Sequence, residues 1–431
     1  MMSEESVPDG YKKTEIGVIP EEWDVCKFKE YLDIKSGKGF KLSEYSETGI
    51  RLLRIDNVTY GKIKWDTIAY LPEDYLTDYS DLVLKEGDIL LALNRPITQN
   101  RLKIGILKKE DVPSILYQRV GKIVFTQKIN PIYVYYWLST YLPPFISKKA
   151  VGSDQPFINI TDLRNLLFIV PNQNEQQKIA SILSKVDEQI SFTESIIEKT
   201  EELKKGLMQQ LLTRGIGHTK FKKTEIGEIP EEWNYLKLEE CCTRITDGSH
   251  LSPKNVDYSG YKIATIANMD GNKFDIESCK NISKEEYDKL FSNGCKPAIG
   301  DILFSKDGTV GLCFVHKQDS NLVLLSSIAI ISPNNEILDS NYGAQSLKSD
   351  LILNHIIGRK TGTAIRRIVL RDLKSVKIPI PPLSEQQQIA SIISKVDEQI
   401  TDNKNYLSYL KELKQGLMQD LLTGKVRVKV S

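Results

Sequence analysis

The sequence contains the same long segments twice, 210 residues apart. The sixteen residues of Glu175–Ile190 return at Glu385–Ile400 with only two differences. The segments Tyr11–Trp23 and Leu203–Thr213 return at the same offset, with 11 of 13 and 9 of 11 residues identical. Internal repeats of this kind decide the fold class, so they come before any other pattern. The chain of 431 residues is therefore predicted to contain two like units in tandem.

Between the repeated segments the two units share little sequence. Residues 24–165 and 234–375, which we call the first and the second insert, have the same length, yet only short motifs recur. GDILLALN in the first insert answers GDILFSKD in the second, and SGKGF at 36–40 occupies the place of TDGSH at 246–250. Short apolar runs bounded by Gly or Asn predict strands, and longer periodic segments such as the one that begins at Pro131 predict helices. We therefore expect each insert to be a mixed α/β domain with a shared fold and a different surface.

Each insert is followed by a predicted long helix. These helices and the other repeated segments together form what we call the frame. The pairs Asn174/Gln177 and Ser384/Gln387 have the spacing of a helix cap and its partner three residues later. Apolar residues then recur every three or four positions over about five heptads, which predicts a coiled-coil-like seam. Because like units usually associate around a two-fold axis, we expect the two helices to lie antiparallel, with one insert near each end. The stripes consist of Ile179, Leu183, Val186, Ile190, Ile197, Leu203, Leu207 and Leu211, and of Ile389, Ile393, Val396, Ile400, Leu407, Leu410, Leu413, Leu417 and Leu421.

These patterns predict an α+β chain in which two globular mixed α/β domains are separated by two long, antiparallel, coiled-coil-like helices, with an internal pseudo-two-fold repeat. No apolar run approaches the roughly 20 residues needed to cross a bilayer, and the polar start of the chain favours a cytoplasmic protein. The predicted segments are a frame segment at 1–23, an insert at 24–165, a central helix at 171–215, a repeated frame segment at 216–233, a second insert at 234–375 and a C-terminal helix at 383–424.

The sequence lacks the catalytic motifs that a duplicated enzyme would be expected to carry twice. It has no G-x-x-x-x-G-K-[ST] phosphate loop, no H-E-x-x-H zinc motif and no G-x-S-x-G nucleophile elbow. Its six cysteines form no C-x-x-C pair, so neither a zinc site nor a disulfide framework is expected. We therefore predict a binding protein with no catalytic residues, no metal and no cofactor.

The excess of positive charge lies on the inserts. Residues 24–164 carry 21 Lys and Arg against 17 Asp and Glu, and residues 234–380 carry 19 against 17, while the whole chain has a net charge of only +1. In two segments, residues 94–103 and 358–374, the basic residues stand among amides or glycines. Arginine matches the major-groove edge of guanine, Asn and Gln match that of adenine, and Lys or Arg also bind phosphate. The candidate DNA-facing residues are Arg95, Asn100, Arg101, Arg359, Lys360, Arg366 and Arg367.

The repeated segments resemble those of one known family. The EIPEEW lead-in, the EQQ-x-IA and VDEQI start of the helix, its LK-x-GLMQ end, and their repetition around dissimilar inserts are similar to the specificity (S) subunit of type I restriction-modification systems. The resemblance covers nearly the whole chain. It implies that the inserts are target recognition domains, each of which reads one half of a bipartite site on double-stranded DNA. It also implies that the helices set the spacer and dock two methyltransferase (modification) subunits, with restriction subunits joining through the complex.

A second hypothesis, from another class of protein, stays open on the sequence. The chain could be a non-catalytic coiled-coil adaptor whose two inserts bind proteins, and the basic segments would then be solvated surface with salt bridges. DNA binding that falls steeply with salt would separate the two hypotheses, because binding releases counterions from the DNA.

Overall fold

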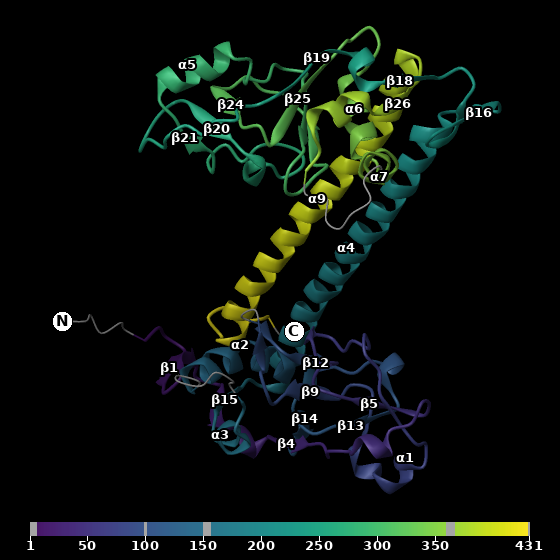
Figure 1. Ribbon diagram of the computed structural model, residues 1–431. Coiled ribbons are helices and arrows are strands. Elements are labelled where there is room, and N and C mark those ends of the chain that lie inside the picture. The colour runs from purple at the N-terminus through teal and green to yellow at the C-terminus, as the bar shows by residue number, and fades with distance from the viewer. Residues whose placement is uncertain (1–6, 99–100, 150–156, 359–366, 430–431) are drawn as a thin grey trace. The chain divides into compact units, whose positions relative to one another are not determined.

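The computed structural model describes residues 7–98, 101–149, 157–358 and 367–429 of the chain. It contains two compact units (Figure 1), one made of Met1–Thr193 with Tyr406–Ser431 and one made of Glu194–Asn405. Each unit holds one α/β insert and half of each of two long helices, α4 (Gln173–Arg214) and α9 (Leu383–Leu422). The predicted layout of two mixed α/β domains with a pair of long helices is confirmed.

The first insert is built on two sheets. The larger has the strand order β4-β14-β9-β12-β6 and the smaller β7-β5-β13-β8. Helix α2 (Pro131–Lys149) buries Trp137 against Phe168 of β15, with their ring centroids 4.6 Å apart. The strands are β4 (Leu32–Ser36), β5 (Ile50–Leu53), β6 (Tyr60–Gly61), β7 (Tyr70–Leu71), β8 (Val83–Leu84), β9 (Ile89–Ala92), β12 (Ile104–Ile106), β13 (Ser114–Leu116) and β14 (Val120–Phe125), with a small hairpin of β10 (Ile97–Thr98) and β11 (Arg101–Leu102).

The second insert repeats this strand order in shorter form. Its larger sheet is β19-β25-β22-β23, antiparallel throughout like β4-β14-β9-β12, and its smaller sheet is β21-β20-β24. The parallel pair β20 and β24 corresponds to the parallel pair β5 and β13. The elements are β19 (Cys242–Asp247), β20 (Lys262–Ala264), β21 (Lys280–Asn281), α5 (Lys284–Ser292), β22 (Ile302–Ser305), β23 (Cys313–Val315), β24 (Leu322–Leu324), β25 (Ile328–Pro333), α6 (Ser340–Lys348) and α7 (Asp350–Gly358).

Each insert leaves and rejoins the frame through a two-stranded pairing and a hairpin. In the first unit the hairpin precedes β3, which pairs with β15, and in the second the corresponding hairpin precedes β18, which pairs with β26. A short helix, α3 (Ile160–Arg164) or α8 (Leu370–Ser375), stands just before the closing strand. The frame strands are β1 (Tyr11–Thr14), β2 (Gly17–Pro20), β3 (Asp24–Lys27) and β15 (Leu167–Val170), and β16 (Phe221–Thr224), β17 (Gly227–Pro230), β18 (Asn234–Lys237) and β26 (Lys377–Ile380).

The long helices pack antiparallel within each unit. In the first unit Ile179 and Leu183, near the start of α4, share a buried core with Leu421, near the end of α9. In the second unit the start of α9 meets the end of α4 in the same way, where Ile389 shares a core with Leu211. In each unit, apolar stripe residues at the start of one long helix therefore pack on residues of the other helix that are more than 170 positions away in sequence.

Two residues of the predicted stripe lie outside the seam. Leu203 is 55% exposed and Leu413 is 37% exposed. The next residue in each case takes the seam position: Lys204 places its Nζ 2.6 Å from Asp397 Oδ1, and Lys414 places its Nζ 2.6 Å from Asp187 Oδ1. Because adjacent helical residues point about 100° apart, a lysine in the seam turns the preceding leucine toward solvent. The prediction that both leucines are buried is wrong.

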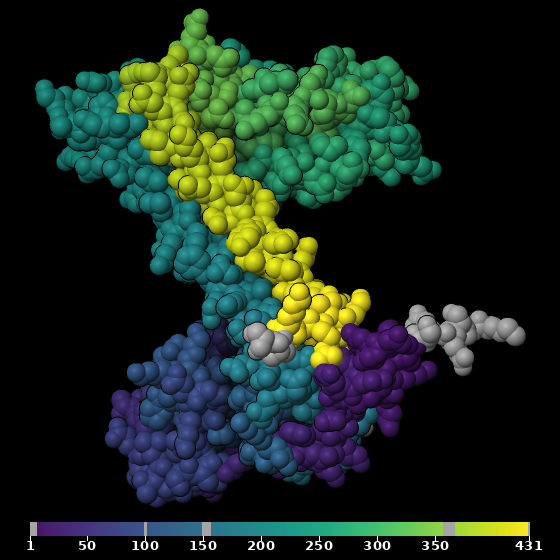
Figure 2. All heavy atoms as spheres, turned by 180° about the vertical axis from the view of Figure 1, so that it is seen from behind, coloured from purple at the N-terminus to yellow at the C-terminus, as the bar shows by residue number. Residues whose placement is uncertain are grey.

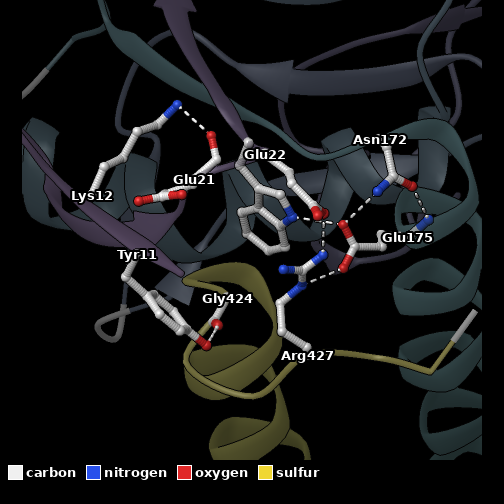
Figure 3. Close-up of polar contacts among 9 residues, drawn as sticks. Tyr11, Lys12, Glu21, Glu22, Asn172, Glu175, Gly424 and Arg427 are labelled. Carbon is white, nitrogen blue, oxygen red and sulfur yellow. Dashed lines mark hydrogen bonds and ion pairs between the residues drawn. The ribbon is translucent and has the colours of Figure 1, made fainter. Parts of the chain in front are cut away.

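A buried glutamate at the start of α4 joins the frame segments of the first unit. Glu175 has no exposed surface, and its carboxylate accepts hydrogen bonds from Trp23 Nε1 at 2.7 Å, Asn172 Nδ2 at 2.7 Å and Arg427 Nε at 2.6 Å (Figure 3). Arg427 also donates to Glu22 at 2.8 Å. The C-terminal end of α9 thus lies beside the N-terminal hairpin (Figure 2), and the EEW and EQQ motifs are contact partners.

The second unit repeats this cluster with a histidine in place of the arginine. Glu385 accepts a hydrogen bond from Trp233 Nε1 at 3.0 Å, and His218 Nε2 lies 2.9 Å from its Oε1. The segment that supplies the histidine follows α4 through Gly215, which has a φ of +64°. A Cβ at Gly215 would lie 2.5 Å from both the Glu385 carboxylate and the Trp233 ring, so the close approach requires glycine.

The next residue of the EQQ motif attaches the insert to the frame. Gln176 is 2% exposed, accepts a hydrogen bond from the backbone N–H of Asn130 at 2.9 Å, and donates to the carbonyl oxygen of Pro171 at 2.7 Å. Gln386 makes the corresponding bonds at 2.8 Å each in the second unit. Since Asn130 directly precedes α2, this amide fixes the principal helix of the insert against the long helix.

The helix caps lie two residues earlier than the sequence spacing predicts. Helix α4 begins at Gln173, and the side chain of Asn172 accepts the hydrogen bond of the Glu175 N–H at 3.0 Å. In the second unit the corresponding residue is Pro382, whose side chain has no hydrogen-bond acceptor. Ser384 lies inside the first turn of α9.

The pairing of Arg427 with Glu175 predicts a large stability difference between two ion pairs of similar geometry. Arg427→Met leaves the fully buried carboxylate without its cation, so the free energy of unfolding of the first unit is expected to fall by about 2–4 kcal/mol. The matched control is Arg164→Met. Arg164 pairs with Asp33 at 2.8 Å, with both side chains more than 40% exposed, and its loss is expected to lower the free energy of unfolding much less, because solvent screens the pair. Urea unfolding of the full chain measures both, and equal losses would contradict the central role of Glu175.

Candidate nucleic-acid interface

In each insert the larger sheet brings several strand ends to one edge. Because β4, β14, β9 and β12 are antiparallel neighbours, the ends of β4 and β9 and the starts of β14 and β12 lie together. We call this side of the sheet the loop edge. In the first insert it comprises residues 36–40, 93–95, 101–103 and 117–119, and in the second insert residues 247–251, 306–308, 325–327 and 367.

Hydrogen bonds and isolated bridges align the two loop edges residue by residue. Leu93 N donates to the carbonyl of Arg119 at 2.9 Å in the first insert, as Lys306 N donates to that of Ser327 at 3.0 Å in the second. Asn94 forms a bridge with Phe157, as Asp307 does with Arg367. It follows that Arg95 corresponds to Gly308, Arg119 to Ser327 and Phe157 to Arg367.

The alignment corrects the pairing of the SGKGF and TDGSH motifs. A Cβ at Gly37 would lie 2.2 Å from a backbone oxygen of Leu116, and a Cβ at Gly248 would lie 2.2 Å from that of Leu324. These two glycines therefore occupy the same tight approach between strand ends. Ser36 corresponds to Asp247, one position away from the pairing that equal offsets predict, because β19 carries one extra residue at a bulge between Cys242 and Arg244.

The three predicted DNA-facing residues that the structure describes all lie on the loop edges. Arg95 is exposed, with a φ of +45°. Arg101 is exposed at the start of β11, and its guanidinium lies 4.6 Å from the centre of the Tyr60 ring. Arg367 is largely exposed and places Nε 3.2 Å from Asp307 Oδ1. Asn100, Arg359, Lys360 and Arg366 lie outside the described residues.

The sequence reasoning missed two exposed cations of the first loop edge. Arg119 follows the smaller sheet and precedes β14, with a φ of +66°. Lys38 donates to the Tyr79 hydroxyl at 2.8 Å and lies 4.1 Å from the centre of that ring. Lys38 lies between Lys35 and Lys41 without amide neighbours, and Arg119 has no second arginine nearby in its segment, so the pattern of arginines among amides or glycines does not detect either residue. Only the antiparallel order of the strands brings both to the edge that carries Arg95.

The second loop edge is built around a buried ion pair. Lys306 is 1% exposed, and its Nζ lies 3.0 Å from Asp247 Oδ2. His250 Nε2 lies 3.7 Å from the same oxygen, while the other oxygen of Asp247 has no hydrogen-bond partner among the described residues. The first insert has Leu93 and Ser36 at the corresponding positions. The two edges thus share a backbone arrangement and differ in chemistry, as expected of surfaces that bind different targets.

Neither a metal site nor a membrane span occurs within residues 7–98, 101–149, 157–358 and 367–429. That part of the chain contains no cluster of three or more His, Cys, Asp or Glu residues arranged to hold a metal ion. It also contains no helix of the length and apolarity needed to span a membrane. The six cysteines are unpaired thiols. Burial raises the pKa of Cys313 to about 12 and that of Cys279 to about 11, so these thiols are protonated at neutral pH.

Comparison with known proteins finds one family twice in the chain. The model of the type I restriction modification DNA specificity domain matches residues 20–202 and again residues 230–412. A putative type I restriction enzyme MjaX specificity subunit of Methanocaldococcus jannaschii is 31% identical over 440 residues, which cover 98% of this chain and 97% of that protein. The type I restriction enzyme MjaVIII specificity subunit of the same organism is 49% identical over 205 residues, which cover 47% of this chain and 48% of that protein.

A solved structure has the same fold. The S subunit of a type I restriction-modification system from M. genitalium matches with a TM-score of 0.59, over 93% of this chain and 96% of that one. The sequence identity is 15%, so this likeness concerns the fold alone.

The buried pair of the second loop edge predicts a non-additive pair of substitutions. Lys306→Met leaves Asp247 charged and unpaired in a buried position, so the free energy of unfolding of the second unit is expected to fall by about 3–5 kcal/mol. In the double variant with Asp247→Asn the charge is gone, and at least about half of that loss should be recovered. Urea unfolding of the two variants and of Asp247→Asn alone measures the coupling, and additive losses would contradict a direct interaction.

Proposed function

Since the chain belongs to the type I restriction-modification DNA specificity family, we propose that it is the DNA-recognition subunit of such a complex. Each insert then reads one half of a bipartite site on double-stranded DNA. The target recognition domains are residues 24–165 and 234–375. The frame consists of segments 1–23 and 216–233 with the helices at 171–215 and 383–424. The chain itself carries out no catalysis, and it acts in the cytoplasm with its partner subunits.

One observation carries this proposal: the two loop edges share their backbone and expose different groups. In the first insert Arg95, Arg101 and Arg119 are exposed, and in the second the largely exposed Arg367 stands beside a buried Lys–Asp pair. Reading DNA needs side chains of defined position at the edges of bases, and strand ends on a rigid sheet supply them. The proposed DNA-binding residues remain Arg95, Asn100, Arg101, Arg359, Lys360, Arg366 and Arg367.

The repeated frame supports docking of two copies of one partner. Leu203 and Leu413 occupy equivalent positions in the repeat, and both are exposed although Ile197 and Leu410, the preceding stripe residues, are buried. An exposed leucine at the same place in two like units suits two identical partner surfaces. We assign these surfaces of a coiled-coil-like, pseudo-two-fold frame to two methyltransferase subunits, with restriction subunits joining through the complex.

The test of DNA recognition uses the chain assembled with its methyltransferase subunits. Methylated adenines mapped in DNA from cells that carry the complex define the cognate site. Binding to a duplex with that site should then weaken by at least about 100-fold as salt rises from about 50 to 200 mM, because several phosphate contacts release counterions. A complex that shows neither a methylation pattern nor salt-dependent binding would favour the protein-binding adaptor instead.

The role of the helices as the spacer predicts the effect of a four-residue insertion. Four residues after Thr200 lengthen α4 by about 6 Å and rotate the remainder of the helix by about 40°. Since about ten base pairs make one 34 Å turn, the recognised gap should lengthen by one or two base pairs, or binding should be lost. Neither half-site sequence should change. Adenine methylation mapping measures the gap, and an unchanged gap at full affinity would restrict the helices to docking partners.

A further inference from the structure

We propose that Arg119, acting with Arg95, makes base-specific contacts in the half-site that the first insert reads. The inference rests on the proposed function and adds a residue that no motif identifies. Guanine is the base that best fits such a contact, because the guanidinium donors match its O6 and N7 acceptors in the major groove. Four observations support the assignment: backbone conformation, anchoring, comparison with the second insert, and exposure.

The backbone at these two arginines is strained. Among the residues that the structure describes, Arg95 and Arg119 are the two non-glycine residues with positive φ, at +45° and +66°. An L-residue in this region brings its Cβ too close to the following carbonyl oxygen, which glycine avoids. Strain of this kind persists where the surroundings impose it, and it gathers at functional sites.

The hydrogen bonds of three strand ends hold Arg119 in this conformation. The carbonyl of Arg119 accepts a hydrogen bond from Leu93 N at 2.9 Å, at the end of β9. Its neighbour Gln118 donates its N–H to the carbonyl of Lys38 at 3.0 Å, beyond the end of β4. Val120 N bonds to Tyr117 O at 3.4 Å across the turn. The position of the arginine is therefore fixed by the sheet rather than by its own side chain.

The second insert shows that this topology does not require an arginine at positive φ. Ser327, which corresponds to Arg119, is not among the residues with positive φ, although it accepts the same hydrogen bond. Gly308, which corresponds to Arg95, has a φ of +63° without a side chain. The first insert thus has Arg95 where the second insert has a glycine. It has Arg119 where the second insert has a serine without positive φ.

Neither guanidinium contributes an internal contact to offset the strain. Both side chains are exposed, and neither forms a hydrogen bond or an ion pair with any residue in the described ranges. The carbonyl of Arg119 accepts the hydrogen bond of Leu93 N, and Arg95 lies two residues after Leu93. Both arginines therefore lie on the same loop edge. Two exposed cations on one loop edge, without acceptors of their own among the described residues, match a ligand that combines negative charge with fixed acceptor groups. DNA has both.

The decisive variant is Arg119→Gly, because it removes the side chain and relieves the backbone at once. The midpoint of thermal unfolding should stay the same or rise by about 2–4 °C. Affinity of the complete complex for its cognate duplex should fall by about 5- to 150-fold, and base changes in one half-site only should become tolerated. Affinity for random duplex should change far less, since the contact is to bases. Arg95→Gly should behave in the same way.

The matched control is Lys109→Ala, which removes the same charge from an exposed residue beyond the opposite end of β12. It should leave the preference for the cognate site intact. Equal losses on cognate and random duplex for Arg119→Gly would make Arg119 a phosphate contact and overturn the assignment. Unchanged affinity and specificity would overturn it as well. Both outcomes require that the unaltered complex binds its site in a salt-dependent way, and failure of that binding would count against the proposed function instead.

Discussion

The two units depend on one interaction, that of a buried or largely buried carboxylate at the first turn of each long helix. Glu175 has no exposed surface and the Glu385 side chain is only 12% exposed. An unpaired charge so largely removed from water would be strongly unfavourable. Each is therefore surrounded by side chains from distant parts of the chain: a tryptophan that follows the frame hairpin, and Arg427 or His218 from the segment beyond the end of the other helix. This requirement brings the hairpin, the start of one helix and the end of the other together in each unit.

The glutamine that follows each of these glutamates connects the frame to the insert. Gln176 and Gln386 each bind the backbone just before the principal helix of an insert, so the α/β domain is attached to the frame by a buried amide. Deeper in the seam, the equivalent pairs Lys204–Asp397 and Lys414–Asp187 repeat one contact at one distance. The frame is constant because its residues contact each other. The exposed side chains of the loop edges make their contacts within the inserts, as Lys38 does with Tyr79 and Arg367 with Asp307, so these edges can differ without changing the frame.

The loop edges show how one strand order supports two chemistries. Leu93 and Lys306 occupy the same position, one in an apolar setting and one in a buried ion pair. The main-chain hydrogen bonds around them are the same. A shared backbone with exchangeable side chains lets each insert change its target without disturbing the sheet, and a strained arginine is tolerated where the sheet already fixes the backbone.

The sequence by itself determined the tandem repeat, the two long helices and the α/β character of the inserts, because repetition and helical periodicity are local properties of the chain. It also indicated Arg95, Arg101 and Arg367 as candidates, because they lie in basic segments. Tertiary structure decided the rest. The burial of Glu175 depends on donors from both ends of the chain, and Leu203 is exposed because Lys204 finds an acceptor on the other helix. Arg119 and Lys38 became candidates only when antiparallel strands placed them beside residues distant in sequence, a proximity that no local pattern encodes.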